Sequence, residues 1–217
     1  MRLAAQDILH KHLRNGNGYP EDYWRGIYLN LSGAELIRFS LQECKVPLVN
    51  FEGARFIGGA GFWNAEFSSL ATFIGATFQG ISNFRDSQFK LGANFEGAVF
   101  QGSVDFEGVT FEDMTVFDGA AFDNDVSFAG SKFADLADFR SVNFSAAAHF
   151  NEATIRESRF QNAEFRGYAV FDSAQFDVEP EFDGATASHP NADHIWPGRW
   201  RTEPPGSDGA SPLVNWE

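Results

Sequence analysis

A cluster of acidic residues in the middle of the chain is the first feature that could do chemistry. No Lys or Arg occurs between Lys90 and Lys132. That window holds eight carboxylates, which we call the acidic belt: Glu96, Asp105, Glu107, Glu112, Asp113, Asp118, Asp123 and Asp125. Two carboxylates facing each other across a cleft could act as acid and base on a glycosidic bond. Exposed on a surface, the same residues would attract a basic or DNA-binding protein.

No other residue pattern indicates a catalytic or metal-binding site. The sequence has no phosphate-binding loop, no H-E-x-x-H motif and no acidic loop with calcium-binding spacing. Cys44 is the only cysteine, which excludes an intrachain disulfide and a cysteine-ligated metal. His10 and His12 are two residues apart, so on a helix they would point to different sides. We therefore predict no cofactor and no metal.

The bulk composition limits the class of protein. The chain has 217 residues, 43% of them hydrophobic, and a formal net charge of −14 at pH 7. Such a charge disfavours direct contact with nucleic acid or an anionic membrane and favours a basic partner. The sequence contains no apolar run of about 18 residues that could span a membrane. Its first residues lack the apolar core of a secretory signal, so we expect a cytoplasmic protein.

The spacing of phenylalanine shows how the acidic residues are positioned. Large apolar residues follow one another in steps of five or six from Leu31 to Phe182, which gives 29 units, 24 of them centred on Phe. The residue two positions before each centre is Ala, Ser or Val in 24 of the 29 units. Cys44 occupies this slot as well, which indicates a packing residue. A helix is excluded, because an apolar helical seam needs steps of three or four.

Each unit is best explained as a short strand with one small and one large inward residue. Alternation directs the residues on either side of the centre outward, and a turn follows. One unit cannot bury its Phe alone, whereas stacked units share a continuous core. Four units per coil would place Phe51, Phe73, Phe95, Phe117 and Phe139 in one column, and Phe56, Phe78, Phe100, Phe122 and Phe144 in the next.

These units resemble the consensus of the pentapeptide-repeat family, roughly A-(D/N)-(L/F)-X-X. The matches include "AEL" at 34–36, "ARF" at 54–56, "ANF" at 93–95 and "ADF" at 137–139, and they continue in phase over about residues 29–184. The resemblance implies an all-β fold, a right-handed quadrilateral parallel β-helix (solenoid) of about seven coils. It also allows a function, because some members of the family mimic DNA and bind, protect or inhibit DNA gyrase.

The sequence departs from that family in its six-residue units, which alternate with five-residue units from Phe56 to Phe150. With four faces per coil, the extra residues fall at two opposite corners, which we expect to be wider. One corner collects Gly59, Ile81, Ser103, Asp125 and Ala147, and the other collects Leu70, Gly92, Met114 and Leu136.

Both ends of the solenoid need a cap, because an open end exposes unpaired backbone groups. We predict an N-terminal helical cap over residues 1–28, in which Leu3, Ile8, Leu9 and Leu13 have helical spacing. The repeat domain spans 29–184. The C-terminal tail, 185–217, contains Trp196, Trp200 and Trp216. We expect its IWPGRW portion to dock on the last coil and "EPPGSDGASP" to be irregular and mobile.

Most acids occupy outward positions on a convex surface, and no insertion builds the cleft that an enzyme needs. We therefore predict a non-enzymatic module that presents an acidic β-helix surface to a protein partner, with no direct contact to nucleic acid or membrane. A homodimer is compatible with the sequence.

The alternative is a DNA mimic that binds DNA gyrase. Residues 31–184 contain 23 acids and 10 bases, a net charge of −13, over about 34 Å of rod. Duplex DNA of that length carries about 20 negative charges. Two features count against this alternative: the belt encircles the rod, and Arg140, Arg156, Arg159 and Arg166 interrupt the later coils.

Overall fold

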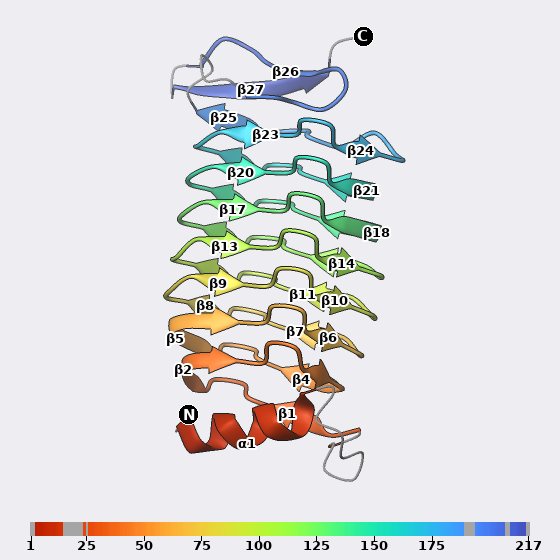
Figure 1. Cartoon of the computed structure of the whole chain (residues 1–217). Coiled ribbons are helices and arrows are strands. Elements are labelled where there is room, and N and C mark those ends of the chain that lie inside the picture. Colours follow the sequence, from red (N-terminus) through yellow and green to blue (C-terminus); the bar gives the residue numbers. More distant parts are fainter. Residues whose placement is uncertain (1–2, 15–23, 25, 189–193, 207–208, 216–217) are drawn as a thin grey trace.

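The structure, a computed structural model, describes residues 3–14, 24, 26–188, 194–206 and 209–215. It is a parallel β-solenoid of about seven coils, with a helix beneath the first coil and antiparallel strands above the last (Figure 1). Each coil has four faces. We name the faces after the phenylalanines that one coil directs into the core: the Phe73, Phe78, Phe84 and Phe89 faces.

The Phe73 and Phe89 faces belong to one hydrogen-bonded sheet. Strands of the Phe73 face are β1 (Tyr28–Asn30), β4 (Leu48–Asn50), β7 (Ala71–Thr72), β11 (Ala93–Asn94) and β15 (Thr115–Val116). Strands of the Phe89 face are β3 (Lys45–Val46), β6 (Glu66–Phe67), β10 (Gln88–Phe89), β14 (Thr110–Phe111) and β24 (Gln175–Phe176). The two faces are joined by strands that turn the corner between them, β18 (Lys132–Asp138) and β21 (Thr154–Arg159).

The Phe78 and Phe84 faces form the second sheet, joined in the same way by β2 (Glu35–Ser40) and β5 (Arg55–Gly61). Strands of the Phe78 face are β8 (Thr77–Phe78), β12 (Val99–Phe100), β16 (Ala121–Phe122), β19 (Asn143–Phe144), β22 (Glu164–Phe165) and β25 (Thr186–Ser188). Strands of the Phe84 face are β9 (Ser82–Asn83), β13 (Val104–Asp105), β17 (Val126–Ser127), β20 (Ala148–His149) and β23 (Ala169–Val170).

The predicted phenylalanine columns are confirmed. The ring of Phe95 stacks on Phe73 at 4.7 Å and on Phe117 at 4.9 Å between centroids. Rings of different columns meet edge to face, as Phe95 and Phe106 do at 5.6 Å. Both arrangements suit the quadrupole of the aromatic ring and add about 0.5–1.5 kcal/mol per pair to the gain from burial. The stacked rings therefore keep neighbouring coils in register.

Corners of two kinds alternate around each coil. After Phe95, the N–H of Ala98 donates to the Phe95 carbonyl (2.9 Å), and Gly97 has a φ of 62°. This is a type II turn, which needs a positive φ at its third residue. It recurs after the centres of the Phe73 and Phe84 faces, and we call these the tight corners. The extra residues lie at the other two corners, the wide corners, as predicted.

A single phenylalanine, Phe39, lies outside the five-and-six register of the sequence. It occupies the small inward slot of the first coil, where it pairs in register with Ala60 of the next coil. The next inward residue is Leu41, where later coils have Phe. This coil therefore has a large residue in both inward slots, and Phe39 remains buried against Phe51 at 5.7 Å.

The N-terminal helix α1 (Leu3–Leu13) covers the first coil, as predicted. Leu9 and Leu13 join the core, and the side-chain Nε2 of Gln6 donates to the Ile37 carbonyl (2.7 Å). Ile8 differs from the expectation: its side chain is 51% exposed, because positions 8 and 9 face different sides of a helix. The side chain of Leu3 lies outside the described residues. No helix in the described part of the chain is long and apolar enough to cross a bilayer.

The C-terminal segment differs from the irregular tail that we expected. β26 (Trp200–Thr202) and β27 (Ala210–Asn215) pair antiparallel, and β27 also pairs with β25 on top of the last coil. The reason is that β25 would otherwise present an unpaired edge. Trp196 and Trp200 dock as predicted, 5.1 Å from Phe165 and Phe182 respectively. Trp216, Ser207 and Asp208 lie outside the described residues.

Candidate interaction surface

The acidic belt is distributed around the whole circumference of the solenoid. Glu96 and Asp118 lie one above the other on the Phe73 face, since the N–H of Gly97 bonds to the Asp118 carbonyl. The other members are Asp123 on the Phe78 face, Asp105 and Glu107 on the Phe84 face, Glu112 on the Phe89 face, and Asp113 and Asp125 at opposite wide corners. The structure therefore forms a ring of acids and does not gather them into one site.

Three cations from neighbouring coils contact the belt. Arg85 donates from Nη1 and Nη2 to the two carboxylate oxygens of Glu107, both at 2.6 Å, and lies 3.8 Å from Asp105. The hydrogen bond to Glu107 raises the pKa of Arg85 above its usual value. Lys90 forms an ion pair with Glu112. The belt is therefore less negative than its sequence window indicates.

Arg140 is the third cation. Its guanidinium lies 3.6 Å from Asp118 and bonds more closely to the buried Asp138, with Nη2 2.6 Å from Oδ2. The hydrogen bond to Asp138 raises the pKa of Arg140. The contacts of these cations with the belt were not predicted, because the cations lie outside the acidic window in sequence. The signal was the coil length: Arg85 and Glu107, like Lys90 and Glu112, are 22 residues apart.

The other four belt residues have no ion pair with any described residue: Glu96, Asp113, Asp123 and Asp125. Two of them shape the wide corners. Oδ1 of Asp113 accepts the N–H of Met114 (2.7 Å), and Oδ1 of Asp125 accepts the N–H of Ala147 in the next coil (3.0 Å). All four side chains are exposed. They are the part of the belt that is available to a cationic partner.

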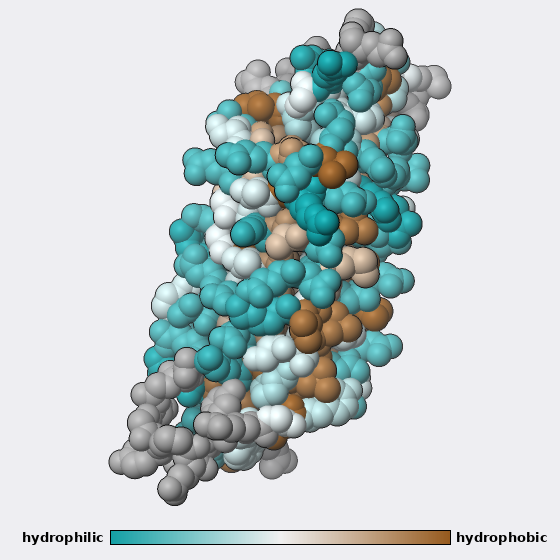
Figure 2. All heavy atoms as spheres, turned by 90° about the vertical axis from the view of Figure 1, so that its right-hand side faces the viewer, coloured by the Kyte–Doolittle hydropathy of each residue, from teal (hydrophilic) through white to brown (hydrophobic). Residues whose placement is uncertain are grey.

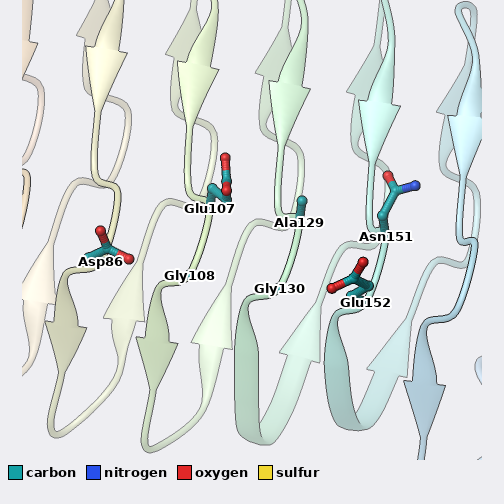
Figure 3. A pocket seen from close by; sticks show the side chains of 7 residues that line it. All are labelled: Asp86, Glu107, Gly108, Ala129, Gly130, Asn151 and Glu152. Atoms are coloured by element: carbon teal, nitrogen blue, oxygen red, sulfur yellow. The ribbon is translucent and has the colours of Figure 1, made fainter.

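A shallow depression of about 230 Å³ lies beside the belt, at the tight corner between the Phe84 and Phe89 faces. Gly108, Ala129 and Gly130 form its floor, and carboxylates lie at both ends, Asp86 and Glu107 at one and Glu152 at the other (Figure 3). This corner needs residues that tolerate a positive φ, and Gly108 (67°) and Gly130 (62°) occupy it. Because glycine has no side chain, the surface is hollowed at these positions. Of the carboxylates that line the depression, Glu107 is already bonded to Arg85.

The surface offers little for catalysis. Among the described residues, no three His, Cys, Asp or Glu side chains are grouped so that they could hold a metal ion. His12 instead stacks on Trp24 with ring centroids 4.5 Å apart. Burial raises the pKa of Cys44 to about 12, so its thiol is protonated at neutral pH and is not a nucleophile. The belt carboxylates lie on convex faces, where water screens them from one another.

Comparison with known proteins identifies the repeat. The family model for pentapeptide repeats (9 copies) matches residues 51–99, 62–110, 95–142 and 139–186. No curated protein matches the sequence at a significant level.

Two of the solved structures that match have low sequence identity. QnrB1, a plasmid-mediated fluoroquinolone resistance protein, is 14% identical with a TM-score of 0.32, over 77% of this chain and 86% of that one. HetL, a pentapeptide repeat protein involved in heterocyst differentiation regulation from the cyanobacterium Nostoc sp. strain PCC 7120, is 15% identical with a TM-score of 0.20. The match covers 79% of this chain and 94% of the HetL chain.

Proposed function

The chain belongs to the pentapeptide-repeat family, and we propose that it is a cytoplasmic, non-enzymatic module that presents its acidic surface to a basic protein partner. The observation that carries this proposal is the exposure of Glu96, Asp113, Asp123 and Asp125 without ion pairs among the described residues. Carboxylates of this kind lose little solvation when a cation approaches. They can therefore accelerate association and add specificity.

The rigidity of the solenoid supports this function. The carboxylates project from strands whose inward rings are stacked above and below, so the outer surface is organised before a partner arrives. A preorganised surface loses less conformational entropy on binding. The depression between Asp86 and Glu152 offers a place for one long cationic side chain of the partner.

Charge reversal tests the proposal. The full chain, used as bait in an extract of its source cell, should capture a protein that the double variant Glu96→Lys/Asp123→Lys no longer captures. The matched control, Glu164→Lys/Asp172→Lys, carries the same change in charge on later coils and should capture it normally. If the belt variant retained the partner as well as the control does, the acidic belt would be excluded as the binding surface.

Mimicry of duplex DNA, with a topoisomerase such as gyrase as the target, is the second candidate. One observation favours it: on the Phe73 face, Glu52, Glu96 and Asp118 occupy the same outward position in three of four successive coils, and Ile74 occupies it between Glu52 and Glu96. Arg140 occupies the same position in the next coil, which opposes it. A supercoiling assay with gyrase separates the candidates, because a DNA mimic should inhibit or protect the enzyme and a generic module should not.

A further inference from the structure

The Phe89 face differs in charge from the rest of the solenoid. Its two outward columns, on either side of the phenylalanine column, contain four cations, Lys45, Lys90, Lys132 and Arg156, and three acids, Glu66, Glu112 and Asp177. The face therefore has a net charge of +1 on a chain whose net charge is −14. Two copies of an acidic protein can approach each other most easily through such a face, because it repels a like-charged neighbour least.

Exposed hydrophobic side chains follow one edge of this face. The wide corner between the Phe89 and Phe73 faces carries Leu70 (47% exposed), Leu91 (55%) and Met114 (48%) on three successive coils. Leu48 lies one coil below them and the partly exposed Leu136 one coil above. We call these five residues the apolar corner. Figure 2 looks onto this side of the rod and shows hydrophobic residues running between hydrophilic ones.

The corner is apolar although its geometry does not require it. The opposite wide corner has the same backbone path and carries polar residues, Ser103 and Asp125, as well as one exposed apolar residue, Ile81. A row of exposed apolar side chains on successive coils of a charged protein is a candidate interaction site.

The order of residues along the face shows which partner fits. The strand register stacks Glu66, Gln88, Thr110 and Lys132 in one outward column. The neighbouring column stacks Ser68, Lys90, Glu112 and Ala134, each one residue after the phenylalanine column. When the four coils are read in the reverse order, each charged position is matched by a residue of opposite charge. Glu66 corresponds to Lys132, and Lys90 corresponds to Glu112.

We propose that the Phe89 face and its apolar corner form the surface on which a second copy of this chain binds, side by side and antiparallel. A two-fold axis between the coils of β10 and β14 brings Glu66 opposite Lys132 of the second copy and Lys90 opposite Glu112 of the second copy. It also brings Leu70 opposite Leu136 of the second copy, and Leu91 opposite the turn that contains Asp113 and Met114 of the second copy. Such an arrangement is isologous, so it closes as a dimer and does not extend into a fibre.

The ion pairs within one copy leave Lys132 available for a contact with the second copy. Lys132 is exposed and forms no ion pair with a described residue, whereas Glu66 is paired with Lys45 at 3.0 Å. Binding would give Lys132 a carboxylate partner without breaking a contact of its own. The self-complementary stretch covers four coils, about 19 Å of rod at the interstrand spacing. It is smaller than a standard protein interface, so the dimer should be weak and reversible, with a dissociation constant in the micromolar range.

Sedimentation velocity of the full chain tests the proposal. From about 1 µM to about 300 µM, the range in which small interfaces associate, the wild-type protein should shift from monomer to dimer. Glu66→Lys and Lys132→Glu should each weaken the dimer at least about tenfold, because each places like charges opposite one another twice. An equimolar mixture of the two variants should regain wild-type affinity as a heterodimer, because each of the two contacts then joins one Lys and one Glu.

Matched controls lie on the opposite side of the rod. Arg55→Glu and Glu164→Lys make the same changes of charge on the Phe78 face and should leave dimerisation unchanged. Leu91→Asp should weaken it, whereas Ile81→Asp, at the opposite wide corner, should not, although Ile81 is 71% exposed. A wild-type chain that stays monomeric throughout this range overturns the proposal. So does a mixture of Glu66→Lys and Lys132→Glu that stays monomeric while both variants melt at the wild-type temperature.

Discussion

The rings of Phe106 and Phe128 lie parallel, with centroids 5.1 Å apart and planes inclined by 1°, although 22 residues separate them in the chain. Phe84 stacks below Phe106 at 4.7 Å. Phe106 is fully buried, so both faces of its ring are in contact with other rings. A ladder of this kind transmits the register of one coil to the next, and several measurable properties depend on it.

Truncation in the middle of the ladder should be severe. Phe106→Ala should lower the free energy of unfolding by about 3–5 kcal/mol, because it removes a buried ring and leaves a cavity between two rigid neighbours. Chemical denaturation monitored by circular dichroism measures this loss. Ile81→Ala, which shortens an exposed residue, is the control and should change stability by less than about 0.5 kcal/mol. Equal effects of the two substitutions would contradict the inward placement of Phe106.

Two glycines should differ in their tolerance of alanine. A Cβ on Gly102 would lie 2.5 Å from the backbone carbon of Gly80 in the coil below, so the coils would have to separate. A Cβ on Gly97 would meet nothing within 4 Å, and only its φ of 62° opposes alanine, at about 1–2 kcal/mol. Gly102→Ala should therefore lower the melting temperature more than Gly97→Ala. The reverse order would show that the wide corners are not in close backbone contact.

The thiol of Cys44 should be unreactive in the folded protein. It is fully buried, and this burial raises its pKa from 9.0 to about 12. A thiol reagent at pH 8 should label it only after denaturation. Rapid labelling of the native protein, at a rate independent of denaturant, would contradict this burial.

The same thiol should make stability depend on pH. Above pH 9 the unfolded state loses the thiol proton and the folded state keeps it, so the unfolded state binds fewer protons. The contribution of Cys44 to stability then falls as pH rises from 9 to about 12, by up to about 1.4 kcal/mol per pH unit. Cys44→Ala should lack this part of the decline when denaturation curves are compared across the alkaline range.

The C-terminal cap should protect the last coils more than the first. Trp200 is buried against Phe182 at 5.1 Å, and in a repeat protein each coil depends mainly on its neighbours. Trp200→Ala should therefore accelerate hydrogen exchange in β22 and β25 and leave β8 and β12 nearly unchanged. A uniform acceleration along the rod would indicate that the solenoid unfolds as one cooperative unit.

The interior of the protein was predictable from the sequence because each inward slot repeats. Two inward residues per unit, one small and one large, were sufficient to identify the columns that contain Phe95 and Phe100 and the corners that contain Gly59 and Leu70. The placement of Phe39 in a small inward slot was not predicted, since it occurs once and carries no period. The pairing of β27 with β25 was not predicted either, because tail strands have no repeat to reveal them.

The surface was harder to predict because its interactions join residues one coil apart. The sequence window from Lys90 to Lys132 indicated an uncompensated acidic belt, whereas the fold brings Arg85, Lys90 and Arg140 onto it. The apolar corner likewise consists of single residues about 22 positions apart, each unremarkable in its own unit. The repeated alternation of small and large side chains was sufficient to predict the solenoid, because the same inward pair, two positions apart, recurs in nearly every unit. Only the stacking of coils decided which charges are neutralised and which apolar residues lie next to one another. This stacking sets the distances between residues of different coils, and the order of residues along the chain does not contain those distances.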